Sequence, residues 1–222
     1  MTPRCQTASA RIRRVGIRSF LIGTLTILCG CSLLGNTGPS PDLFQLAAPP
    51  AVESASKGTL IRLIVSPVEG AGLIDTHRVL FSNDPIERGF YQFASWTEPP
   101  AKQFNRFLMQ AIEQSKGFRT VTDPSAAVLG DLQLRVVLTE FYHDTSTPPG
   151  LAKVSAQCEL IDLRTHSLKA RRTFASAVDA KQFDARGAVI ALSGASDSVL
   201  REIVAWIQDA TKDEKSETPP RS

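Results

Sequence analysis

The chain has 222 residues, of which 42% are hydrophobic and 21% are charged, and its formal net charge is +3. This length suits one folded domain with a substantial core. Residues 1–30 contain five arginines and no acidic residue, so the remaining 192 residues carry a net charge of −2. The basic balance therefore gives no support to nucleic-acid binding.

The first thirty residues have the pattern of a bacterial secretory signal. Arginines precede an apolar run from Phe20 to Cys29, which at about ten residues is roughly half of what a membrane-spanning helix needs. The tetrapeptide that ends at Cys31, Leu-Cys-Gly-Cys, resembles the lipobox of bacterial lipoproteins. We therefore predict that a signal peptide, residues 1–30, is removed and that the Cys31 thiol takes a diacylglyceryl group as a lipid anchor.

The mature chain divides into three parts. Residues 31–41 hold the lipidated cysteine and a tether rich in Gly, Pro and Ser. Residues 42–210 are the predicted folded domain, and the charged segment 211–222 is predicted to be a disordered tail. Once Cys31 carries lipid, Cys158 alone remains as a thiol, so no intramolecular disulfide is expected and we interpret Cys158 as a core residue.

Alternating apolar and polar residues predict strands along this domain. The last three strands follow one another with no helical pattern between them, which predicts an antiparallel meander. The predicted strands are a short one at Phe44–Leu46, then Leu60–Val65, Arg78–Ser82, Gly89–Phe93, Leu132–Thr139, Ala152–Leu160 and Leu168–Val178.

Two segments have helical periodicity. The first begins after a predicted N-cap at Thr97 and ends at Gly117, and the second runs from an N-cap at Asp184 to Gln208. The expected fold is α+β, a two-layer sandwich of a mainly antiparallel sheet with two amphipathic helices on one face. The first apolar stripe is Phe104, Phe107, Leu108, Ala111 and Ile112, and the second is Val189, Leu192, Ser196, Val199, Ile203 and Trp206.

Catalytic signatures are missing from the sequence. It contains no Gly-x-Ser-x-Gly elbow, phosphate-binding loop or dinucleotide fingerprint. Asp75 and His77 are two residues apart, but a polar turn explains them better than a catalytic pair because no nucleophile is nearby. The histidines are widely spaced, so neither a metal site nor a cofactor is expected, and we do not expect an enzyme.

Aromatic residues gather between Phe90 and Trp96. Core packing explains this cluster best. A contact surface for a partner or for cargo is the alternative, and Phe93 and Trp96 are then the candidate contact residues.

The order of landmarks resembles the ABC-type transport auxiliary lipoprotein family. These landmarks are Leu73-Ile74-Asp75, Arg78-Val79-Leu80-Phe81, Phe90-Tyr91, the helix start Trp96-Thr97-Glu98-Pro99-Pro100, and the ending Ile203-Val204-Ala205-Trp206-Ile207. The resemblance covers about residues 42–208. One departure is Phe44-Gln45-Leu46, where family members usually carry a Tyr-x-Leu strand.

The resemblance implies a non-enzymatic, periplasmic lipoprotein, usually attached to the outer membrane. Its partners would be an inner-membrane ABC transporter and a periplasmic protein of the mammalian-cell-entry type, which together move lipid or other apolar cargo between the envelope membranes. A homo-oligomeric ring is implied for some members. The alternative function is that of a structural adaptor lipoprotein in outer-membrane assembly, which would share the anchor and the fold.

Overall fold

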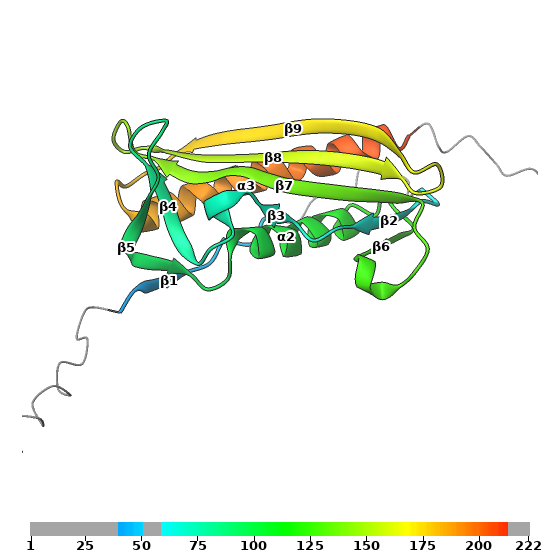
Figure 1. Ribbon diagram of the computed structural model, residues 1–222, viewed down its shortest axis with the longest axis horizontal. Helices are drawn as coiled ribbons and strands as arrows, with labels where there is room; N and C mark the ends of the chain where they lie inside the picture. The colour runs from blue at the N-terminus through cyan, green and yellow to red at the C-terminus, as the bar shows by residue number, and fades with distance from the viewer. Residues whose placement is uncertain (1–39, 51–58, 213–222) are drawn as a thin grey trace, which may run out of the picture. The chain divides into compact units, whose positions relative to one another are not determined.

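The computed structural model describes residues 40–50 and 59–212. Of these, the residues from Pro41 to Lys212 belong to one compact unit (Figure 1). The predicted signal peptide, Cys31, most of the tether and nearly all of the predicted tail lie outside the described residues.

A nine-stranded sheet forms most of this unit. The strand order is β1-β5-β4-β7-β2-β6, while β3 pairs with β7, and β8 lies between β7 and β9. The strands are β1 (Asp42–Phe44), β2 (Arg62–Val65), β3 (Glu69–Gly70), β4 (Arg78–Ser82), β5 (Gly89–Trp96), β6 (Thr120–Thr122), β7 (Leu132–Asp144), β8 (Leu151–Asp162) and β9 (Ser167–Asp179).

The long strand β7 organises the sheet. Along one edge it pairs with β8 over its whole length, from Leu132 to Asp144. Along the other edge, three short strands pair with it one after another: β2 at Leu132–Leu134, β3 at Val137–Leu138 and β4 at His143–Asp144. One strand thus joins the two ends of the domain (Figure 1).

The prediction of a mainly antiparallel sheet is wrong for most strand pairs. The antiparallel meander of β7, β8 and β9 is confirmed, and β4 and β5 also form an antiparallel pair. Five other pairs, β1–β5, β2–β6, β2–β7, β3–β7 and β4–β7, are parallel. Alternation within a strand shows which face is buried, but it does not show which distant strand lies alongside or in which direction.

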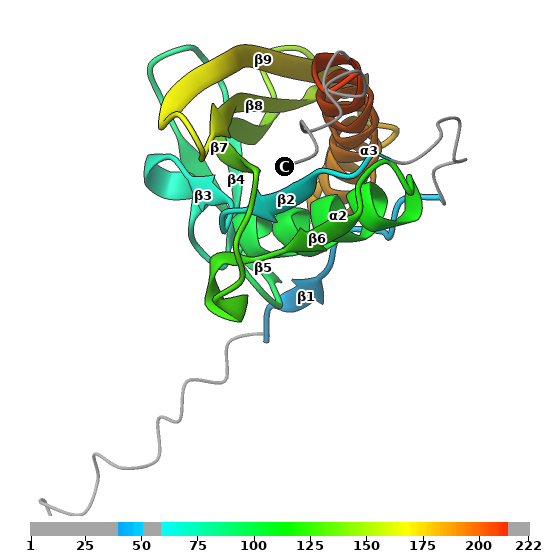
Figure 2. The ribbon, with the colours of Figure 1, turned by 90° about the vertical axis from the view of Figure 1, so that its right-hand side faces the viewer.

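Both predicted helices are present, as α2 (Pro100–Gln114) and α3 (Ala185–Ala210). Figure 2 shows the sheet curled, with both helices on its inner side, so the fold is α+β with a curled mixed sheet. The N-cap at Asp184 is confirmed, because its carboxylate accepts a hydrogen bond from the N–H of Gly187 at 2.7 Å. The Thr97 cap is wrong, since α2 begins after Pro99 with Pro100 at its first position, where the missing N–H costs little.

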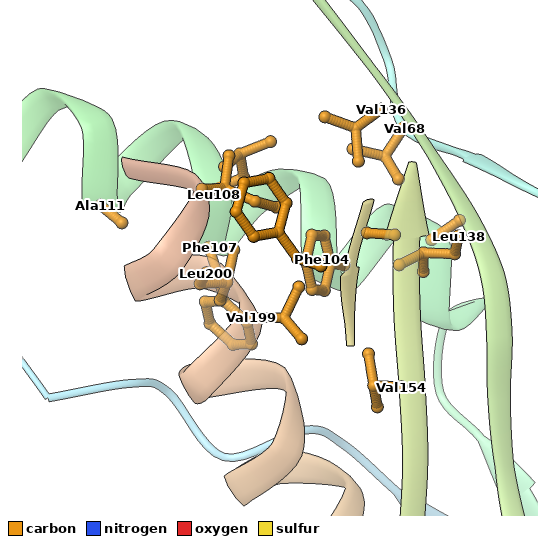
Figure 3. Packing of buried hydrophobic residues seen from close by; sticks show 14 of the residues in the cluster. Val68, Phe104, Phe107, Leu108, Ala111, Val136, Leu138, Val154, Val199 and Leu200 are labelled. Atoms are coloured by element: carbon orange, nitrogen blue, oxygen red, sulfur yellow. The ribbon is translucent and has the colours of Figure 1, made fainter. Parts of the chain in front are cut away.

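The core lies between the helices and the sheet (Figure 3). The apolar stripe of α2 is buried as predicted, and Phe104 is fully enclosed. Cys158 on β8 is also fully buried, which confirms it as a core residue. Side chains that meet in this core include Val68, Phe104, Phe107, Leu108, Val136, Leu138, Val154, Val199 and Leu200.

Candidate functional site

Phe93 and Trp96 end up in different environments although both lie on β5. Trp96 is only 2% exposed, and its ring packs against the edge of Phe141 with centroids 6.0 Å apart. Its side chain belongs to the core, so a partner cannot reach it. Phe93 is 48% exposed and remains available for contact.

Phe93 shares its side of the sheet with a second exposed apolar residue, Leu43. Strand β1 pairs with β5 in parallel, with Leu43 beside Ser95. Side chains two residues apart on a strand share a face, so Phe93 and Ser95 point away from the buried Trp96 and toward the side of Leu43. Leu43 is 68% exposed. We call the surface formed by Leu43 and Phe93 the β1–β5 face.

The positively charged side chain of Arg78 lies beside this face. Arg78 on β4 is paired with Ser95, and its guanidinium carbon lies 4.2 Å from the centroid of the Phe90 ring. Cation–π contact of this kind holds an arginine over an aromatic ring. The β1–β5 face is therefore apolar with an arginine at its border, a composition common in protein–protein contacts.

Two polar side chains that the sequence did not single out fix the chain just after β1. Gln103 of α2 is fully buried, and its Oε1 accepts a hydrogen bond from the N–H of Leu46 at 2.8 Å. Its Nε2 donates to the carbonyl of Glu98 at 2.6 Å. The N–H of Ala47 donates to Oγ of Ser193 on α3 at 3.0 Å. Both helices thus hold the segment that follows β1.

A sequence signal for Gln103 existed. It lies four residues before Phe107, so it shares the apolar stripe of α2 although it is polar. A polar residue within a buried stripe needs hydrogen-bond partners. The sequence does not show that the partner is the main chain of Leu46, which is 57 residues away.

A buried histidine lies near the other end of β5. His143 of β7 is fully buried, and its Nε2 lies 3.1 Å from the carbonyl oxygen of Pro149. Because a carbonyl only accepts, Nε2 carries the proton, and the Nδ1 of a neutral ring can then accept from the Tyr91 hydroxyl at 2.7 Å. Burial lowers the pKa of His143 from its ordinary value of 6.5. Burial raises the pKa of Tyr91 to about 12.

Gly150 makes room for this histidine. Its φ of +91° lies in the region that favours glycine, and a Cβ there would meet Nε2 of His143 at 2.1 Å. Tyr91 and His143 are therefore a closed polar pair with all hydrogen-bonding groups of the ring used, which indicates a structural role.

A polar cavity of about 300 Å³ lies between the β4–β5 loop and β7. Arg88 extends over the ring of Tyr142 at 4.5 Å and donates to Oγ of Ser82 at 2.9 Å. Lys153 donates to the carboxylate of Asp144 at 2.6 Å, and this bond lowers the pKa of Asp144 to about 2. Since both cations are already engaged, the cavity does not offer a ready anion site.

His77 and Cys158, the residues with side chains that could take part in catalysis, have structural roles instead. Nδ1 of His77 donates to the carbonyl of Trp96 at 3.0 Å. Burial raises the pKa of the Cys158 thiol to about 12, which makes it a poor nucleophile.

Among residues 40–50 and 59–212, no three His, Cys, Asp or Glu side chains are grouped so that they could hold a metal ion. In the same part of the chain, no helix has the length and apolar character to span a membrane.

The chain belongs to the family of ABC-type transport auxiliary lipoprotein components, whose family model matches residues 44–204. It is therefore a lipoprotein of the bacterial envelope and an auxiliary component of an ABC-type transport system. This is a transport auxiliary family and not a known enzyme family. None of the curated proteins is similar enough to count as a relative.

Solved structures support the fold. A DUF330 protein of Xanthomonas campestris has a TM-score of 0.72 at 20% identity, over 79% of this chain and all of that one. An uncharacterized protein has a TM-score of 0.59 at 18% identity, over 76% of this chain and 99% of its own. PelC of Paraburkholderia phytofirmans, solved as a dodecamer, has a TM-score of 0.44 at 11% identity, over 73% and 93%. Likeness as weak as the last gives no guide to the assembly of this chain.

Proposed function

We propose that this auxiliary lipoprotein works by protein–protein contact, docking a periplasmic component of its transport system through the β1–β5 face. The observation that carries this proposal is the exposure of Leu43 and Phe93, at 68% and 48%, on two adjacent strands. The docked component would be of the mammalian-cell-entry type, and the system would move lipid or other apolar cargo between the envelope membranes.

The position of β1 supports this choice of surface. Strand β1 begins at Asp42, and the predicted anchor at Cys31 precedes it by roughly ten residues, which span at most ~35 Å when extended. The β1–β5 face then stays close to the membrane that holds the anchor. Because the domain alone cannot cross the periplasm, a partner has to cover the remaining distance.

We also propose attachment to the periplasmic side of the outer membrane. The residue after Cys31 is Ser32, whereas an aspartate there commonly marks retention in the inner membrane. Acylation of the anchor, for example by palmitate, gives stable attachment when more than one chain is present. Fractionation of the two membranes on a sucrose gradient tests this proposal, and recovery with inner-membrane markers would contradict it.

Crosslinking in cells tests the docking surface. The variant Leu43→Ala/Phe93→Ala should fold normally, because both side chains are largely exposed, and should lose most of the crosslinked transport component that the wild type captures. Leu129→Ala is the matched control, since Leu129 is 80% exposed and lies in the loop between β6 and β7. The control should capture the component as the wild type does.

Two outcomes would overturn the proposal. If the double variant captures the component as well as the wild type does, the β1–β5 face is not the docking surface. If the wild type captures no transport component and copurifies with outer-membrane assembly proteins, the proposed docking role fails and the structural adaptor function is preferred.

A further inference from the structure

The last strand of the sheet has an open edge. Among the described residues only β8 pairs with β9, which is one of the longest strands of the domain. Figure 1 and Figure 2 both show β9 at the border of the sheet. Twelve of its thirteen residues are at least partly exposed, and only Phe174 is buried. A long strand edge of this kind is a template for pairing with another strand.

The pairing with β8 shows which backbone groups face outward. The N–H of Ala180 donates to the carbonyl of Gly150 at 2.9 Å, so the residues of β9 that alternate with Ala180, such as Val178 and Phe174, direct their backbone groups toward β8. The intervening residues direct their N–H and C=O groups toward the open edge. These are Arg171, Thr173, Ala175, Ala177 and Asp179.

Only the first part of the edge is irregular. The ladder between β8 and β9 shifts register between Leu160 and Ile161, opposite Lys169, and such a bulge disturbs pairing on a free edge. From Ala170 onward the ladder is regular. The outward-facing residues at its centre, Thr173, Ala175 and Ala177, carry small side chains that would not obstruct a neighbouring strand.

The charged residues of this regular segment are complementary to those of the same segment in a second copy of the protein. If two copies of β9 run antiparallel about a two-fold axis at Ala175, Arg171 of each copy lies opposite Asp179 of the other. Thr173 then lies opposite Ala177, and Ala175 opposite its own counterpart. Arg171 already contacts Glu159 at 2.7 Å, but a guanidinium has five N–H donors and can also meet the Asp179 carboxylate. Opposite charges directly across two strands stabilise the pair.

We propose that two copies of this protein pair through their β9 edges, antiparallel and centred on Ala175, to form one continuous sheet. The contact is isologous, so it closes on itself as a dimer. It uses backbone hydrogen bonds and one repeated ion pair rather than a large apolar surface. This inference goes beyond the transport role and does not depend on the β1–β5 face.

Cysteine crosslinking of the full-length protein in its own membranes tests the pairing. In the proposed register the two Ala175 Cα atoms are about 5.5 Å apart, within the range that a disulfide bridges. Mild oxidation of Ala175→Cys should therefore give a covalent homodimer on a non-reducing gel. Cys158 is fully buried, so wild-type protein should give little or none.

Ala177→Cys is the matched control. Ala177 is exposed on the same face of the same strand, but its counterpart in the other copy would lie four residues away along the strand, at about 14 Å. This variant should crosslink at least ~10-fold less. A third variant, Ala175→Cys with Asp179→Arg, places like charges opposite each other and should lower the dimer yield several-fold.

The proposal is overturned if Ala175→Cys gives no homodimer above the wild-type level, or if Ala177→Cys crosslinks equally well. Capture of a different protein by Ala175→Cys, with no homodimer, would also overturn it, because the edge would then accept a strand from another partner. Thermal melting of each variant checks that the fold is intact before the yields are compared.

Discussion

The hydroxyl of Tyr91 lies 2.7 Å from Nδ1 of His143 and joins β5 to β7 across the intervening strand β4. The ring of Phe81 on β4 packs against Tyr91 with centroids 5.1 Å apart, so the polar contact is built into an aromatic layer. His143 is also the residue of β7 that pairs with Phe81 of β4. It therefore helps to hold the β4–β5 hairpin, and with it the β1–β5 face, onto the rest of the domain.

Tyr91→Phe should destabilise the protein by about 1–3 kcal/mol, because it leaves Nδ1 of His143 buried without a donor. Chemical unfolding at neutral pH measures the loss. Tyr142→Phe is the control, since its ring lies under Arg88 and the substitution keeps that ring. An equal loss in both variants would mean that the Tyr91 hydroxyl has no special role.

Stability should fall as the pH drops below about 6.5. Burial lowers the pKa of His143, so between its folded value and its ordinary value of 6.5 the unfolded chain binds more protons than the folded one. The contribution is fully present above pH 6.5 and is lost as the pH falls toward the folded pKa. The hydrogen bond to the Pro149 carbonyl and the charges of Asp144 and Asp184 oppose the shift in pKa but do not reverse it.

His143→Gln should reduce this acid dependence, as measured by unfolding free energies at several pH values between 8 and 5. His166→Asn is the control because His166 is exposed in the β8–β9 turn, and Asn tolerates the positive φ of 54° found there. A wild-type protein whose stability stays flat across this range would contradict the prediction.

Trp96→Ala should lower the free energy of unfolding by about 3–5 kcal/mol, since it removes a large buried side chain and leaves a cavity beside Phe141. Phe93→Ala should cost less than about 1 kcal/mol, because much of Phe93 is already in water. Thermal and chemical denaturation give both values. Similar losses for the two variants would show that Phe93 is a packing residue and not a free contact.

Gln103→Met should release the segment after β1. The substitution keeps the volume but leaves the N–H of Leu46 without its acceptor. The expected result is faster amide hydrogen exchange at Leu46 and a loss of about 1–3 kcal/mol. Gln110→Met changes an exposed residue of the same helix and should have little effect, and equal exchange rates at Leu46 in both variants would refute the role of Gln103.

Cys31→Ser should abolish lipidation, because serine has no thiol to be alkylated. Metabolic labelling with a fatty-acid analogue measures the anchor, and Cys158→Ser is the control that keeps Cys31. Equal label in Cys31→Ser and wild type would place the lipid elsewhere.

Local sequence patterns were enough to predict the family and several elements of the fold. The family landmarks identified the transport auxiliary lipoprotein family. The apolar stripe from Phe104 to Ile112 predicted α2, and the N-cap at Asp184 predicted the start of α3. Alternating apolar and polar residues predicted the meander of β7, β8 and β9. These features depend on contacts between neighbouring residues or on a repeat along the chain, so they can be read without the fold.

Strand neighbours and the burial of individual aromatic residues depend on contacts between distant parts of the chain, so they could not be predicted from local patterns. The short strands β3 and β6 have too few residues to show a periodic pattern, so the sequence does not predict them. Each forms because it pairs with another strand, β3 with β7 and β6 with β2. Phe93 and Trp96 are three residues apart in one aromatic cluster, yet Trp96 packs against Phe141 in the core while Phe93 stays exposed. The physical reason is that burial depends on what packs from the other side, and that neighbour comes from a distant part of the chain.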